Sequence, residues 1–173
     1  MKVAIIVPPK NFSDETLSKL LLVLHKWNID VTLSSYTTSQ CIGLHGAIYT
    51  PDVNTAKLNP LDYSALLLVD GPGVDSYRLQ DFKPLIDLTK LFIKENKIIG
   101  AFGNSVKIFI RANGFTPGKI SAQESAEVRS FAATSRYVVT DKGVEVYKNL
   151  ITATNSGNAI ELANELLVKL GVK

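Results

Sequence analysis

The segment KIIGAFGNSVKIFI, residues 97–110, decides the fold of this chain. Its apolar run breaks at Gly103 and then continues with apolar residues at helical spacing, a pattern that predicts a buried strand, a sharp turn and a helix. In α/β enzymes such a turn holds a nucleophile on a strained backbone, beside amide N–H groups that stabilise an oxyanion. The residue at the apex here is Gly103, which has no side chain that could attack a substrate.

The totals of the sequence fit one globular domain. The chain has 173 residues, of which 46% are apolar and 20% are charged, so we expect a single domain over residues 1–173 with one good core. Its net charge of +3 includes no basic cluster dense enough for nucleic acid or an anionic membrane. The apolar runs are far shorter than the roughly 20 residues that a membrane span needs. A single cysteine, Cys41, allows no internal disulfide and favours a cytoplasmic location.

Strand and helix patterns alternate along the chain, which predicts an α/β fold with a mostly parallel sheet covered on both faces. Residues 34–46 are rich in Ser, Thr and Gly and predict a loop or short hairpin, and residues 130–134 and 137–140 predict short strands or loop. The strands are predicted at residues 3–7, 29–33, 47–50, 65–69, 98–102, 144–147 and 150–153. The helices are predicted at about 13–27, 79–95, 105–113 (closed by Gly114) and 158–170.

Polar and glycine-rich segments follow three of the predicted strands. They are residues 8–13, 70–73 and 103–105. In open α/β sheets, ligands bind beyond the carboxyl ends of the strands, near the point where the strand order reverses. We therefore expect these three segments to converge on one site.

The motifs at these strand ends resemble those of the ThiJ/PfpI superfamily of class I amidotransferase-like domains, and of its PfpI-like branch in particular. Residues 62–73, DYSALLLVDGPG, are similar to the family's YDALVLPGGPG strand and turn, and residues 97–110 resemble its K-P-V-A-A-I-C-H-G-P-x-x-L elbow. The GLHG of residues 43–46 matches a G-x-H-G loop. Residues 144–152 and 156–159 are close to V-V-V-D-G-N-L-I-T and P-G-x-A. The resemblance covers nearly the whole chain in order and spacing.

This resemblance implies a flavodoxin-like three-layer sandwich that forms homo-oligomers, as dimers or hexamers. It also implies a set of activities: intracellular protease-like peptide hydrolysis, glyoxalase or deglycase chemistry, and chaperone or stress roles. The family's active members use an elbow cysteine held close to a glutamate after the first strand. The branch nearest to this chain often adds a histidine beside that cysteine.

The sequence departs from the family at each of these positions. The cysteine position is Gly103, the histidine position is Asn104, and the glutamate position is Ser13. The family's Gly-Gly turn has become Asp70-Gly71. These changes predict a pseudoenzyme, a non-catalytic homologue that binds a small molecule or serves assembly.

The alternative is a hydrolase or lyase with relocated machinery. Asp70 could act as an acid or base or bind an amine, or it could simply form an Asx turn. Ser105 is the substitute nucleophile, although a hydroxyl needs an adjacent base, and Ser in a first helical turn more often bonds to the backbone. In this hypothesis the amides of Gly71 and Asn104 would serve as oxyanion donors.

The remaining reactive side chains predict no metal or cofactor. His45 could carry acid–base chemistry, but the resemblance places its counterpart at the periphery or at a subunit contact. Cys41 has no flanking Lys, Arg or His to lower its pKa, so we expect it to be inert. Two histidines and one cysteine without clustered spacing predict no metal site. The stretch 71–73, GPG, is too short for a dinucleotide fingerprint, so no cofactor is predicted.

Overall fold

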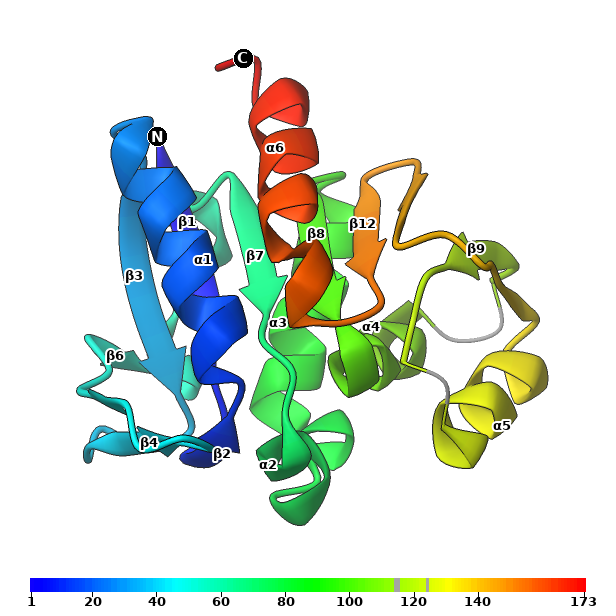
Figure 1. Cartoon of the computed structure of the whole chain (residues 1–173), viewed down its shortest axis with the longest axis horizontal. Coiled ribbons are helices and arrows are strands. Elements are labelled where there is room, and N and C mark those ends of the chain that lie inside the picture. Colours follow the sequence, from blue (N-terminus) through cyan, green and yellow to red (C-terminus); the bar gives the residue numbers. More distant parts are fainter. Residues whose placement is uncertain (114–115, 124) are drawn as a thin grey trace.

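A seven-stranded sheet runs through the centre of the computed structural model, which describes residues 1–113, 116–123 and 125–173 (Figure 1). Its strand order is β11-β12-β8-β7-β1-β3-β6, and every neighbouring pair is parallel except β11 with β12. The strands are β1 (Lys2–Ile6), β3 (Asp30–Ser35), β6 (Val53–Asn54), β7 (Ala65–Leu68), β8 (Ile98–Phe102), β11 (Val144–Tyr147) and β12 (Leu150–Ala153).

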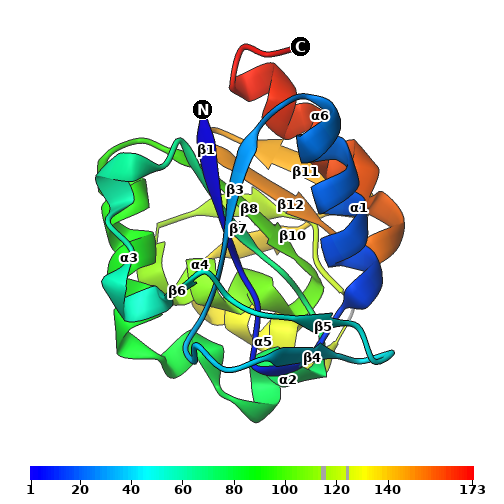
Figure 2. The same ribbon diagram turned by 90° about the vertical axis from the view of Figure 1, so that its left-hand side faces the viewer.

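Helices cover both faces of this sheet and make three layers, which Figure 2 shows from the side. On one face lie α1 (Asp14–Lys26) and α6 (Ala159–Lys169), and on the other α3 (Lys83–Lys94) and α4 (Val106–Asn113). Two hydrophobic clusters fill the spaces between the layers, one on each side of the sheet. Every residue of β7 and β8 is buried, as expected for parallel strands covered on both faces. The predicted fold class is confirmed.

The first helix forms as its sequence pattern indicates. The Ser13 hydroxyl accepts a hydrogen bond from the Thr16 amide at 3.2 Å and so satisfies one of the free N–H groups at the helix start. Leu17, Leu20 and Leu24 are buried on one face. The chain leaves the helix at Asn28, whose φ of +52° is a left-handed conformation that Asn tolerates.

Smaller elements surround the ends of the main sheet. One small sheet contains β2 (Lys10–Phe12), β4 (Cys41–Gly43) and β5 (Ile48–Tyr49), and another contains β9 (Gly118–Ile120) and β10 (Tyr137–Val139). Two short helices, α2 (Pro72–Ser76) and α5 (Ala126–Thr134), complete the set, together with 3-10 turns at residues 55–57, 60–62, 79–81, 103–105 and 156–158.

Several predictions of local structure need correction. The strand or loop predicted at residues 130–134 is wrong, because these residues belong to α5, which Ser125 caps by accepting from the Val128 amide at 3.1 Å. The helix predicted from residue 79 begins instead at Lys83, after a 3-10 turn, with Pro84 in its first turn, where a proline costs no hydrogen bond. The short strand predicted at residues 47–50 is confirmed as β5, Ile48–Tyr49, and it lies in a small sheet. The predicted helix end at Gly114 lies outside the described residues.

The topology brings the three predicted strand ends together. β8, β7 and β1 are neighbours in the sheet, and their carboxyl ends lie at the end opposite the two chain termini (Figure 1). The main chain joins two of the segments directly, because the Ser13 amide donates to the Asp70 carbonyl at 2.8 Å. Within the described residues, no helix has both the length and the apolar character to cross a membrane.

Candidate functional site at the strand–helix elbow

Gly103 lies at the apex of the elbow, between β8 and α4, in a conformation suited to glycine. Its φ of +49° is in the left-handed region. A Cβ atom built at this position would lie 3.1 Å from both the Cβ and the Oδ2 of Asp70, closer than ordinary van der Waals contact. A side chain at the apex would therefore be crowded by the Asp70 side chain.

Asp70 follows β7 and is held inside the elbow. Its side chain is buried, with 9% of the residue exposed, and its Oδ1 accepts a hydrogen bond from the Thr16 hydroxyl at 2.7 Å. Burial raises the pKa of this carboxyl above its ordinary value, although hydrogen bonds from Thr16, from its own main chain and from Ser13 act in the opposite direction. The negative charge of Glu15 adds to the rise of the Asp70 pKa. Asp70 faces Gly103 and is not turned to solvent.

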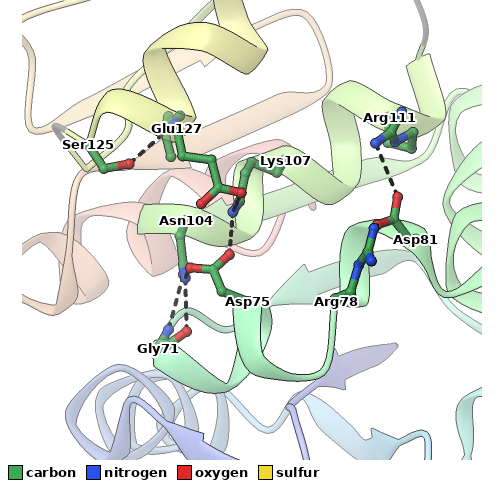
Figure 3. A network of polar contacts seen from close by, with 10 residues as sticks. Gly71, Asp75, Arg78, Asp81, Asn104, Lys107, Arg111, Ser125 and Glu127 are labelled. Atoms are coloured by element: carbon green, nitrogen blue, oxygen red, sulfur yellow. Dashed lines mark hydrogen bonds and ion pairs between the residues drawn. The ribbon is translucent and has the colours of Figure 1, made fainter.

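Asn104 and Gly71 form a closed pair of hydrogen bonds, which Figure 3 shows. The Gly71 amide donates to Asn104 Oδ1 at 3.2 Å, and Asn104 Nδ2 donates back to the Gly71 carbonyl at 2.9 Å. Gly71 itself has a φ of +131°, and a Cβ there would lie 2.4 Å from the Asn11 carbonyl oxygen. The Gly71 amide, which we expected as an oxyanion donor, is thus already occupied by a side chain of the protein.

A buried lysine extends this pair into a charged network (Figure 3). Asn104 Nδ2 also donates to Asp75 Oδ2 at 2.9 Å, and the other oxygen of Asp75 pairs with Lys107 Nζ. Lys107 is fully buried and also pairs with Glu127 Oε1 at 2.8 Å. The network joins α2, the elbow, α4 and α5, so it fixes the elbow from three sides.

Ser105 is bound to the main chain. Its hydroxyl lies 2.7 Å from the Leu68 carbonyl and 2.8 Å from the Phe102 carbonyl, and it accepts from the Phe102 amide at 3.0 Å. The residue is fully buried. These bonds tie the end of β7 to the end of β8, and they leave the Ser105 oxygen neither exposed nor free of partners.

Comparison with known proteins places the chain among relatives of the same architecture. The family model described as DJ-1/PfpI family matches residues 1–169. The chain belongs to the DJ-1/PfpI family.

Individual members of the DJ-1/PfpI family agree with this assignment. The chain is 30% identical over 166 residues to the uncharacterized protein MJ0967 of Methanocaldococcus jannaschii, covering 96% of this chain and 80% of that protein. In structure it is similar to a ThiJ/PfpI domain protein from Brachyspira murdochii, with a TM-score of 0.91, 20% identity and coverage of 99% and 97%. Drosophila melanogaster DJ-1beta has a TM-score of 0.84, 19% identity and coverage of 99% and 91%. The two structural likenesses show the shared fold.

The G-x-H-G loop of this DJ-1/PfpI chain is held by a carboxylate that the sequence pattern did not reveal. Asp14 accepts hydrogen bonds from the amides of His45 and Ala47, each at 2.8 Å. Burial alone would raise the pKa of Asp14, but these hydrogen bonds outweigh it and the pKa is lowered. Gly43 allows this approach, because a Cβ there would lie 2.2 Å from Asp14 Oδ1. The His45 residue is exposed, so Asp14 binds the backbone of the loop.

The structure thus joins some of the predicted site residues and separates others. Ser13, Asp70, Gly71, Gly103 and Asn104 meet at the elbow.

Outside the elbow, Cys41 is buried in β4, and burial raises the pKa of its thiol. Among residues 1–113, 116–123 and 125–173, no group of three or more His, Cys, Asp or Glu side chains is arranged to hold a metal ion.

The residues that the sequence interpretation missed are Thr16, Asp75 and Lys107. One signal was available for the lysine: residues 106–110, VKIFI, place it inside an otherwise apolar run, where a charge must find partners.

Proposed function

We propose that this DJ-1/PfpI protein does not carry out cysteine chemistry at its elbow and acts instead by binding a small molecule or by assembling with copies of itself. One observation carries the proposal: the Asp70 side chain crowds the apex, because its Cβ and Oδ2 lie 3.1 Å from the position that a Cβ at residue 103 would take. The resemblance that assigns the cysteine to this position also assigns a histidine and a glutamate to positions held here by Asn104 and Ser13.

The hydrogen bonds of the elbow support the same reading. An oxyanion site needs N–H groups that are free to meet the developing charge. The Gly71 amide is used by Asn104, and Asn104 is itself held by Asp75 at 2.9 Å. Opening the amide would break this paired arrangement and disturb the ion pairs of the buried Lys107. These contacts give the Gly71 amide a structural partner and so support the proposal.

Turnover assays test the proposal. Peptidase, glyoxalase and deglycase assays on the unmodified protein should give no rate above the buffer. The positive control is a triple variant, Gly103→Cys with Ser13→Glu and Asp70→Gly, which restores the family's pair and also removes the side chain that blocks it. Robust turnover by the unmodified protein that Asp70→Asn abolishes would contradict the proposal.

A second candidate is acid–base chemistry by Asp70, because its raised pKa leaves more of the acid form near neutral pH than an exposed carboxyl would have. In this alternative Asp70 acts as the acid or base of a hydrolase or lyase. Ser105 contributes little to it, since its hydroxyl is buried and bonded to the Leu68 and Phe102 carbonyls. A rate lost in Asp70→Asn but kept in Ser105→Ala would favour this candidate, and a rate unchanged in both would exclude it.

Assembly has support on the small sheet. Ile42 and Ile48 lie opposite each other in the β4–β5 pair, with 40% and 59% of each residue exposed, and Leu44 beyond them is 48% exposed. Exposed apolar side chains gathered on one face mark contact surfaces more often than scattered ones do. We propose that this face joins two copies of the chain. Light scattering should show a dimer or larger species, and Ile48→Lys should reduce it to the monomer while the exposed Leu22→Lys should not.

A further inference from the structure

A second concave site lies at the opposite end of the sheet from the elbow. It is formed where β8 and β12 begin, between the end of α3, the end of α4 and β10, and it has a volume of about 180 Å³. Ile99 and Leu150 contribute apolar surface from the two strands, and Phe109 and Tyr137 contribute aromatic surface. An apolar cavity of ~150 Å³ accepts benzene, so this one accepts a single ring with a small substituent.

The aromatic side chains of this cavity are already arranged edge to face. The rings of Phe109 and Tyr137 have centroids 6.2 Å apart and planes inclined by 84°. Such edge-to-face contacts are favourable for aromatic rings, and a third ring can extend the same packing. Tyr147, also in the lining, adds another aromatic group on the β11 side.

The polar groups of the cavity favour a negatively charged substituent. The Tyr137 phenol oxygen accepts from Asn113 Nδ2 and keeps its own proton to donate, and burial raises the pKa of this phenol, which keeps that proton in place. Lys97 is committed elsewhere, since its Nζ donates to the Pro60 and Tyr63 carbonyls at 2.5 and 2.7 Å. Lys148 is exposed at the rim.

Lys148, unlike Lys97, has no such hydrogen bonds to main-chain carbonyls among the described residues. Its Nζ lies 5.5 Å from the centroid of the Tyr147 ring, and none of the described ion pairs includes it. It lies in the β11–β12 turn, with a backbone φ of +56° that is uncommon for a lysine. Among the described residues that line the cavity, two are lysines and none is an Asp or Glu.

We propose that this cavity binds a small aromatic carboxylate, with its ring against Phe109 and Tyr137 and its carboxylate toward Lys148 and the Tyr137 hydroxyl. The proposal rests on the binding role proposed above, and it is independent of what happens at the elbow. It specifies the ligand by three features together: one ring, one negative charge, and a total size near that of benzoate.

The test is an NMR titration of the intact chain with benzoate, compared with benzyl alcohol and benzylamine. Benzoate should give saturable shifts at about 10 mM or below, centred on the amides of Ile99 and Leu150, as expected for a ligand of this size. Benzyl alcohol should bind more weakly, and benzylamine weakest of all. Lys148→Glu should weaken benzoate at least roughly fivefold, the effect of losing one exposed charge interaction and gaining a repulsive one. Lys26→Glu makes the same charge change on α1, in the other helical layer, and should have no effect.

A second variant localises the site. Ile93→Phe adds volume at the cavity wall on α3 and should abolish benzoate binding. Because the added atoms enter a cavity and not a packed core, the unfolding temperature should stay close to that of the unmodified chain. Absence of saturable shifts with benzoate, or equal binding of the three probes unaffected by Lys148→Glu, would overturn the proposal. Turnover assays on the same preparation separate this result from the proposed function, because loss of benzoate binding says nothing about a rate at the elbow.

Discussion

Adding a single methyl group at the apex of the elbow should be costly, and the cost should depend on Asp70. In Gly103→Ala the new Cβ lies at a backbone φ of +49°, where an L residue costs about 1–2 kcal/mol. It also meets the Cβ and Oδ2 of Asp70 at 3.1 Å each, and overpacking of this kind costs about 1–3 kcal/mol. We therefore expect Gly103→Ala to lower the free energy of unfolding by about 2–5 kcal/mol.

A double-mutant cycle separates the two contributions. In an Asp70→Gly background both contacts disappear, so Gly103→Ala should cost only about 1–2 kcal/mol from the backbone. The coupling between the two positions is then about 1–3 kcal/mol. Asp70→Ala is the graded control, because it removes Oδ2 but keeps the Cβ that lies 3.1 Å from the new atom, and it should relieve only part of the cost.

The assay is urea unfolding of the four cycle members and the control, followed by circular dichroism. The loss of the Thr16 hydrogen bond in Asp70→Gly occurs on both sides of the cycle and cancels. Additivity of the two substitutions within about 0.5 kcal/mol would show that Asp70 does not crowd a side chain at the apex, and the reasoning behind the proposed function would fail.

Three further predictions concern the polar groups of the elbow. Because the pKa of Asp70 is raised on folding, the folded chain binds this proton more tightly than the unfolded chain, so stability falls as pH rises from 3.8 through the folded pKa. The variant Asp70→Asn should lack this fall. Its free energy of unfolding relative to that of the unmodified chain should therefore increase between pH 3.8 and the folded pKa and then level off, which urea unfolding from pH 3 to 8 would measure. Ser105→Ala should lower the free energy of unfolding by about 1–3 kcal/mol, since it leaves two strand ends without their shared hydroxyl, and a cost near zero in urea unfolding would contradict this role. Replacing Asp75 and Glu127 together by Asn and Gln should cost about 3–5 kcal/mol, because it leaves Lys107 buried without a charge partner, and adding Lys107→Met should recover most of that loss. Thermal unfolding of the double and triple variants would check the recovery, which a surface role for Lys107 would not produce.

The fold was predictable because its strands and helices are strongly patterned. Residues 65–69 and 98–102 are apolar throughout, and such strands can be stable only where helices cover both faces, which the structure confirms. Predictions of secondary structure failed where the hydrophobic pattern was weak. The helix α5 has only Val128 and Ala132 buried, so its period was hard to see, and its decisive signal was the Ser125 cap. For this helix the N-cap residue was therefore a better predictor than the spacing of the apolar residues.

The candidate site was only partly predictable for a different reason. The convergence of Ser13, Asp70 and Gly103 follows from topology, since the carboxyl ends of neighbouring parallel strands lie together. The contacts between them depend on side-chain geometry that spacing does not encode. Nothing in the sequence indicated that Asn104 would occupy the Gly71 amide, because the two residues are 33 positions apart and the pairing needs the positive φ of Gly71.

These contacts make the changes at the elbow dependent on one another. A side chain at residue 103 would meet Asp70 at 3.1 Å, so an aspartate after β7 and a larger residue at the apex crowd each other in this backbone. The carboxylate at residue 70 in turn uses Thr16 as its hydrogen-bond partner, from the same first turn of α1 that Ser13 caps. Asn104 then bonds to the turn that follows Asp70 and orients Asp75 toward Lys107. A cysteine introduced at residue 103 alone would therefore crowd Asp70, beside a Gly71 amide that is already bonded to Asn104. A cysteine at residue 103 therefore needs a change at residue 70 as well, which is why the triple variant includes Asp70→Gly.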